Sequence, residues 1–228
     1  MIIILALLSF LILVTLFLTS HKRRRLVRWH LRHIRAMSYQ QWLDLLLGLI
    51  QLGLVLVCLL FSDALALDGL LTFLGRVSFG WEIICYVLLY SIALVELTLL
   101  VLVLLFDLML KKDSRLLLGK MTWLAFKPDR AAASFLLLSL VTLVDAFCYL
   151  GLCLFLGKDS VAGLTLVVLG YTLVKACRYS GWLQQLLALC LFSVIGVWCV
   201  TAALLYGWLI GSLLLTLTYL LISFKEQH

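Results

Sequence analysis

The 228-residue chain is 65% hydrophobic and only 13% charged, with a net charge of +7. Soluble domains contain roughly 45–50% apolar and about 25% charged residues, so this composition excludes an ordinary soluble fold and leaves no room for a separate soluble domain. We therefore expect one all-α domain over residues 1–228, a polytopic transmembrane helix bundle in the cell membrane.

The apolar runs predict about seven membrane spans. The first run has no basic leader and no small-residue cleavage signal, which indicates a retained span rather than a signal peptide. The last run is about 40 residues long, twice what one crossing needs. A polar-aromatic break over 201–207 splits it in two, and without that split the count is six. The predicted spans cover residues 1–20, 42–61, 81–107, 132–156, 161–177 and the two parts of 183–224.

Basic residues predict the orientation of these spans. With seven spans, sixteen of the 18 lysines and arginines fall on one side, and only Arg76 and Lys158 fall on the other. Because basic loops remain in the cytoplasm, the N-terminus is expected outside and the C-terminus inside the cell. Residues 108–131 then form a basic cytoplasmic loop. The half-apolar segment 63–80 is expected to lie on the outer membrane surface as an interfacial or re-entrant piece.

The densest charge lies in residues 21–36, which are predicted to form a basic juxtamembrane helix at the cytoplasmic surface. Val27, Leu31 and Ile34 fall roughly opposite its arginines. We expect contact with anionic lipid headgroups, and an acidic partner protein is the alternative. Nucleic-acid binding is not expected, because no binding module accompanies the charge. His30 and His33 have no cysteine or carboxylate close by, so no metal site is predicted. The arginines at helical spacing are Arg25, Arg28, Arg32 and Arg35.

Small residues bear on how the helices pack. The seven cysteines lie in or beside apolar runs and form no C-x-x-C pair, so we expect packing residues rather than disulfides or a zinc site. Ala203, Gly207 and Gly211 have small-xxx-small spacing, which allows another helix of this chain or of a partner to approach closely.

The third predicted span carries three acids on one face. At 100° per residue, Glu96 lies about 40° from Glu82, and Asp107 about 20° from Glu96. Tyr86 lies at the edge of this face. Glu82 and Asp107 are near the span ends, whereas Glu96 is roughly 22 Å from the outer end. A charge at the bilayer centre costs about 2.5–3.5 kcal/mol, so Glu96 needs a partner or a proton.

Two further charges lie at a similar depth. Asp145 is roughly 17 Å and Lys175 roughly 21 Å from the outer ends of their spans. Glu96, Asp145 and Lys175 are therefore predicted to form a buried charge cluster, with Arg178 one turn beyond Lys175. Such a cluster fits three roles: fixing helix packing, pairing with another subunit, or carrying protons or cations.

Enzyme chemistry is not predicted. The chain has no G-x-S-x-G elbow and no H-E-x-x-H pair, and its four histidines lie away from the buried acids. No cofactor is expected. The leading hypothesis is a non-enzymatic membrane subunit that packs with other membrane proteins. The alternatives are a proton- or cation-coupled transporter or channel that uses Glu96 or Asp145, and a small membrane sensor or regulator.

Overall fold

The computed structural model describes residues 2–19, 23–34, 39–78, 80–109, 111, 132–179 and 181–225. Within these ranges all regular structure is helical, as the sequence predicts. Most of the predicted basic loop 108–131 lies outside the described residues, and so does Arg35.

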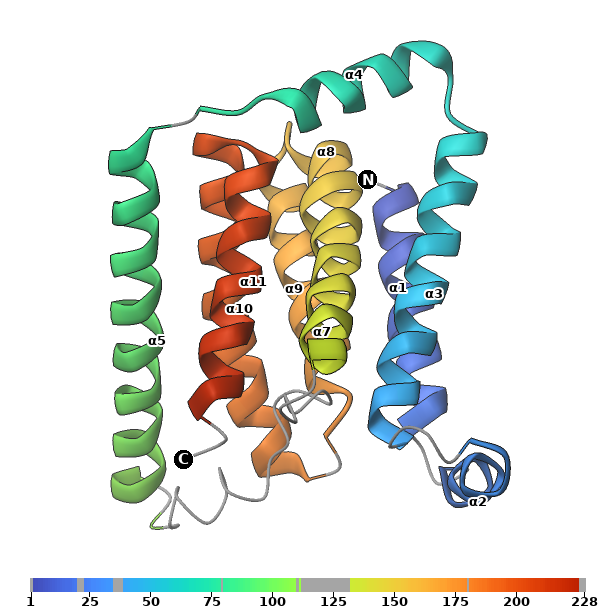
Figure 1. Cartoon of the computed structure of the whole chain (residues 1–228), viewed down its shortest axis with the longest axis vertical. Coiled ribbons are helices and arrows are strands. Elements are labelled where there is room, and N and C mark those ends of the chain that lie inside the picture. Colours follow the sequence, from blue (N-terminus) through green and yellow to red (C-terminus); the bar gives the residue numbers. More distant parts are fainter. Residues whose placement is uncertain are drawn as a thin grey trace.

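In the described part of the chain, seven helical segments run side by side in alternating directions (Figure 1). In the fourth segment an α-helix passes directly into a π-helix and then into a last α-helical turn. The segments are α1 (Ile2–Thr19), α3 (Tyr39–Leu60), α5 (Trp81–Met109), α7 with η1 and α8 (Ala132–Ala146, Phe147–Cys153, Leu154–Gly157), α9 (Val161–Ala176), α10 (Trp182–Tyr206) and α11 (Trp208–Lys225).

Five helices in the described ranges are long and apolar enough to cross a membrane. Two further bundle helices, α9 and the described apolar part of α11, are shorter apolar segments. The seven-span count and the orientation therefore stay predictions. The five long stretches are Ile2–Thr19, Trp42–Leu60, Trp81–Leu108, Leu138–Gly157 and Trp182–Tyr206.

The last apolar run divides at Gly207, at the end of the predicted break. Gly207 has φ +104°, and a Cβ there would overlap the carbonyl oxygen of Arg76, so this turn requires glycine. The Ser78 amide and hydroxyl both donate to the Tyr206 carbonyl, at 3.1 and 3.0 Å, and so satisfy the end of α10. The chain then reverses into α11.

The small-xxx-small spacing is used within the chain. A Cβ added at Gly211 would lie 2.7 Å from the Cβ of Ala203, so α10 and α11 approach closely at this pair. A similar contact joins α9 to α1, because Gly170 faces the side chain of Leu8.

Burial is uneven across the bundle. In an 18-residue apolar window between Leu138 and Gly157, 67% of the residues are buried, against 18% in the corresponding window of α5. The main core gathers residues of α9, α10, α11 and η1. Helix α5 stands at the edge, with α10 and α11 between it and the pair α7 and α9 (Figure 1).

Two short helices lie across the ends of the bundle rather than along it (Figure 1). Helix α4 (Ala64–Gly75) crosses the end where α3 ends and α5 begins, which is the arrangement expected of an interfacial segment. Helix α2 (Arg23–His33) lies beside the opposite end, between α1 and α3 in the chain.

Candidate functional site

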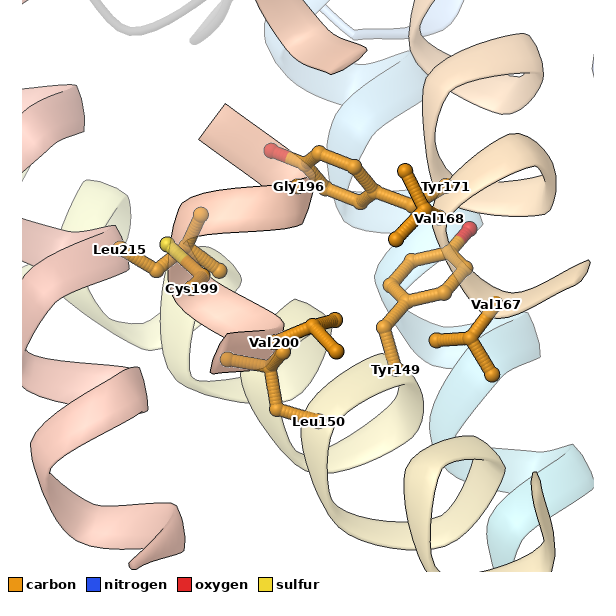
Figure 2. Close-up of a pocket in the computed structure, with 9 residues that line it drawn as sticks. All are labelled: Tyr149, Leu150, Val167, Val168, Tyr171, Gly196, Cys199, Val200 and Leu215. Carbon is orange, nitrogen blue, oxygen red and sulfur yellow. The ribbon is translucent and has the colours of Figure 1, made fainter. Parts of the chain in front are cut away.

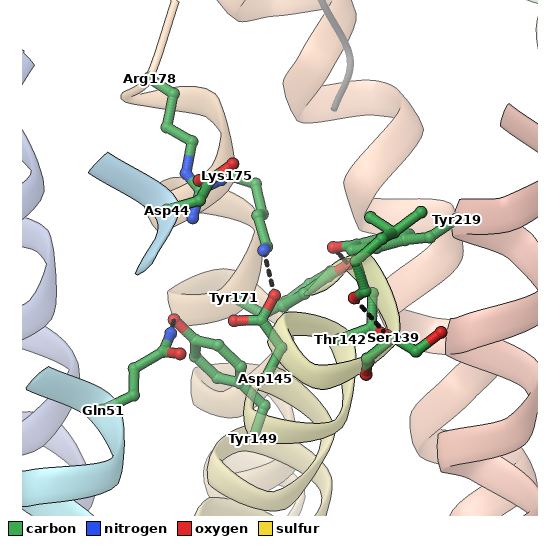
Figure 3. Close-up of polar contacts among 11 residues, drawn as sticks. Asp44, Gln51, Ser139, Thr142, Asp145, Tyr149, Tyr171, Lys175, Arg178 and Tyr219 are labelled. Atoms are coloured by element: carbon green, nitrogen blue, oxygen red, sulfur yellow. Dashed lines mark hydrogen bonds and ion pairs between the residues drawn. The ribbon is translucent and has the colours of Figure 1, made fainter. Parts of the chain in front are cut away.

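Asp145 and Lys175 form an ion pair inside the bundle (Figure 3). Asp145 lies on the last turn of α7, and Lys175 on the last turn of α9. Their side chains are 1% and 4% exposed. Each charge thus meets its opposite away from the bundle surface, which offsets the cost of burying either one alone.

A second ion pair joins Arg178 to Asp44 of α3. Their side chains are 20% and 7% exposed, so this pair lies nearer the end of the bundle. Burial lowers the pKa of Arg178, but the Asp44 and Asp145 carboxylates and the nearby tyrosines together raise it by more, and the net pKa lies above the ordinary value. The end of α9 is therefore tied to α7 through Lys175 and to α3 through Arg178.

Tyrosines surround the inner pair. The Tyr171 and Tyr219 hydroxyl oxygens are 2.6 Å apart in a buried hydrogen bond. The Lys175 ammonium lies 5.9 Å from the centre of the Tyr171 ring and 5.3 Å from that of the Tyr219 ring, within the range of cation–π attraction. The Tyr149 ring meets the Tyr171 ring edge-on at 5.3 Å, and its hydroxyl accepts a 3.4 Å hydrogen bond from Gln51. These contacts extend the polar network from α3 to α11.

The π-helix η1 begins two residues after Asp145. Within it the Leu154 amide reaches the carbonyl of Tyr149, five residues back. The wider turns of a π-helix rotate the residues that follow it relative to those that precede it. Such π-helical turns inside α-helices are frequent at functional sites. The Trp208 indole also donates to the Ala146 carbonyl at 3.3 Å, which fixes α11 against the start of η1.

A cavity of about 10 Å³ lies beside the network and is lined by Tyr149, Tyr171, Gly196, Cys199 and aliphatic residues (Figure 2). This volume is at the lower limit for one water molecule. A second cleft of about 120 Å³ lies between α5 and α10, where the rings of Tyr90 and Trp198 stack at 5.7 Å. Neither space includes the carboxylate of Asp145 or the ammonium of Lys175 in its lining.

The structure brings together two members of the predicted charge cluster and leaves the third apart. Glu96 is exposed on α5, and α10 and α11 lie between α5 and the helices α7 and α9, which carry Asp145 and Lys175 (Figure 1). Equal depth along the helix axes led to the prediction of one cluster, but depth does not determine which helices are neighbours. Glu82 and Asp107 are also exposed, and Tyr86 lies on the same helix.

The network also includes residues that sequence reasoning did not place in the charge cluster. Asp44 and Gln51 are the polar residues of an otherwise apolar run, and their presence in that run is the sequence feature that could have marked them as buried and paired. Tyr149 shares the face of Asp145 by its spacing of four residues. Tyr219 had no such signal, because only tertiary packing brings it to Tyr171. Thr142, on the face of Asp145, donates to carbonyls of its own helix at 2.9 and 3.0 Å.

The basic helix α2 exposes Arg25, Arg28 and Arg32. Leu31, predicted on its apolar side, is 64% exposed, and His30 is 1% exposed instead. Helical geometry explains the difference, because His30 falls between Leu26 and Ile34 around the axis. Within the described residues, no group of three or more histidine, cysteine or acidic side chains is placed to hold a metal ion.

Residues 84–226 match the model of a family of unknown function (DUF5968). The matched segment is more than half of the chain and includes Asp145, Lys175 and Arg178, whereas Asp44 precedes it. No curated protein and no solved structure matches the chain.

Proposed function

The chain belongs to that family, and we propose that it is a non-enzymatic integral membrane subunit that packs against another membrane protein through α5. The proposal includes seven crossings of the cell membrane, with the N-terminus outside and the C-terminus in the cytoplasm. It is supported by the seven antiparallel segments among the described residues and by the sixteen-to-two distribution of basic residues.

The observation that carries the proposal is the exposed face of α5. This helix has 29 residues and is roughly 43 Å long, and only 18% of the residues in its apolar window are buried within the chain. Glu96 is exposed halfway along it, whereas Asp145, Lys175 and Asp44 are turned into the bundle. A partner helix that packs on this face covers its apolar side chains and places its own groups beside Glu96.

The same face suggests the chemistry of the partner. Glu82, Glu96 and Asp107 are all exposed on α5, about 21 Å and about 17 Å apart along its axis. A partner helix that carries lysine, arginine or hydrogen-bond donors at mid-depth complements Glu96. The large apolar side chains between the acids, such as Leu89, Leu97 and Leu100, are 68%, 61% and 59% exposed and supply the packing surface.

Affinity purification from native membranes in a mild detergent tests the proposal. Wild-type protein is expected to retain a stoichiometric membrane partner, and Glu96→Lys is expected to lose it. Breaking one side of a buried interfacial charge pair costs about 2–5 kcal/mol, or at least roughly 30-fold in affinity. Asp68→Asn removes an exposed acid from α4 and serves as the matched control. Wild-type protein that purifies alone, or Glu96→Lys with its partner retained, would refute the proposal.

A second candidate function is a proton or cation path, and the buried network favours it. The bonded Tyr171 and Tyr219 hydroxyls and the Asp145–Lys175 pair place several exchangeable protons close together. The purified chain in liposomes containing a pH-sensitive dye tests this function directly. Proton flux that Asp145→Asn abolishes and Asp68→Asn preserves would support it. Flux no greater than in protein-free liposomes would rule it out.

A further inference from the structure

Helix α2 is held in a defined place at the edge of the bundle. The Trp29 and Trp42 rings are 5.9 Å apart, and the ring of His30 lies 5.7 Å from that of Tyr39 and 5.8 Å from that of Trp42. These are ordinary distances for packed aromatic rings. Leu26 packs against a small apolar cluster at the junction of α1 and α3. The helix is thus anchored through one side, and its other side is presented outward.

The outward side is an arginine face. At 100° per residue, Arg25, Arg28 and Arg32 fall within an arc of about 60°, and His30 lies nearly opposite. All three arginines are exposed. Exposed apolar residues flank this face on both sides, with Trp29 47% and Leu31 64% exposed.

We propose that the arginine face of α2, formed by Arg25, Arg28 and Arg32, binds the headgroups of anionic phospholipids. The helix lies across the bundle axis at the level where α1 ends and α3 begins (Figure 1). In a membrane, this level is the headgroup region of one leaflet. Guanidinium groups pair with phosphate oxygens through two parallel hydrogen bonds, which suits a row of lipid phosphates.

The flanking residues favour lipid over an acidic protein as the occupant. Leu31 and Trp29 place apolar surface beside the arginines, which matches the boundary between headgroups and acyl chains. An acidic protein would neutralise the arginines but would leave this apolar surface to be covered separately. The inference requires that the bundle is inserted in a membrane, and it does not depend on a protein partner at α5.

Native mass spectrometry of the purified full-length chain tests the inference by titration with phosphatidylglycerol or phosphatidylcholine. Wild-type protein is expected to bind phosphatidylglycerol more tightly, with a preference that weakens as salt is raised. One basic residue near an anionic surface contributes about fivefold in affinity. Arg28→Gln is therefore expected to weaken phosphatidylglycerol binding several-fold, and the triple variant Arg25→Gln, Arg28→Gln, Arg32→Gln at least about tenfold.

Arg76→Gln is the matched control, because it removes one exposed arginine at the opposite end of the bundle. It is expected to leave phosphatidylglycerol affinity unchanged. An unchanged preference in the triple variant would overturn the inference, and so would equal losses in Arg28→Gln and Arg76→Gln. A triple variant that keeps its lipid preference but loses a co-purifying protein would assign this face to an acidic partner instead.

Discussion

Replacing Lys175 by methionine removes the positive member of the buried pair and keeps most of the side-chain volume. The Asp145 carboxylate, 1% exposed, then remains without its cation. Leaving one partner of a buried pair uncompensated costs about 3–5 kcal/mol. Asp145→Leu is expected to cost a similar amount by leaving the ammonium behind.

The double variant Asp145→Leu, Lys175→Met gives the sharper result. With both charges removed, the stability is expected to return to the wild-type value or exceed it, since well-packed apolar pairs often replace buried ion pairs without loss. Unfolding in mixed micelles titrated with SDS, followed by circular dichroism, measures the differences. Asp68→Asn on α4 is expected to change stability by no more than about 0.5 kcal/mol. A Lys175→Met variant as stable as wild type, or a double variant as unstable as both single variants, would refute this reasoning.

Two further predictions use the same unfolding assay. Gly207→Ala is expected to destabilise the protein by about 3 kcal/mol or more, because φ is +104° and the new Cβ overlaps the Arg76 carbonyl. Gly53→Ala on α3 is the control, because the added Cβ meets nothing within 4 Å, and it is expected to stabilise the protein by up to about 1 kcal/mol. Equal effects of Gly207→Ala and Gly53→Ala on stability would contradict the assignment of the turn. Tyr219→Phe is expected to cost about 1–2 kcal/mol by leaving the buried Tyr171 hydroxyl without its 2.6 Å partner. In a protein that already carries Tyr171→Phe, Tyr219→Phe is expected to cause no further loss of stability. A full loss of about 1–2 kcal/mol in this background would show that the stability effect does not come from the hydrogen bond.

Periodicity and composition predicted the helices well but not their neighbours. The length of the apolar runs placed the helices within a few residues, and the polar-aromatic stretch before Gly207 indicated the division of the last run. Asp145 and Lys175 were correctly matched by depth. Glu96 was matched by the same rule and lies elsewhere, because rise per residue specifies height and says nothing about position around the bundle.

Other features left no trace that a pattern could detect. The π-helix η1 differs from an α-helix only in its hydrogen bonds, and its residues, FCYLGLC, read as an ordinary apolar segment. The ring contacts of His30 with Tyr39 and Trp42 likewise depend on how α2 packs against the start of α3. Tyr219 joins Tyr171 only because α11 folds back along α10.

The two ion pairs can form only late in the synthesis of the chain. Asp145 precedes its partner Lys175 by 30 residues, and Asp44 precedes Arg178 by 134. In the proposed membrane setting, α3 and α7 leave the ribosome with acids whose cations have not yet been made. Both are neutralised when the end of α9 arrives, so a single helix completes two contacts at once. A chain truncated before Lys175 lacks the cations of both pairs, so we expect the contacts of α9 with α7 and α3 to form only after the end of α9 has been synthesised.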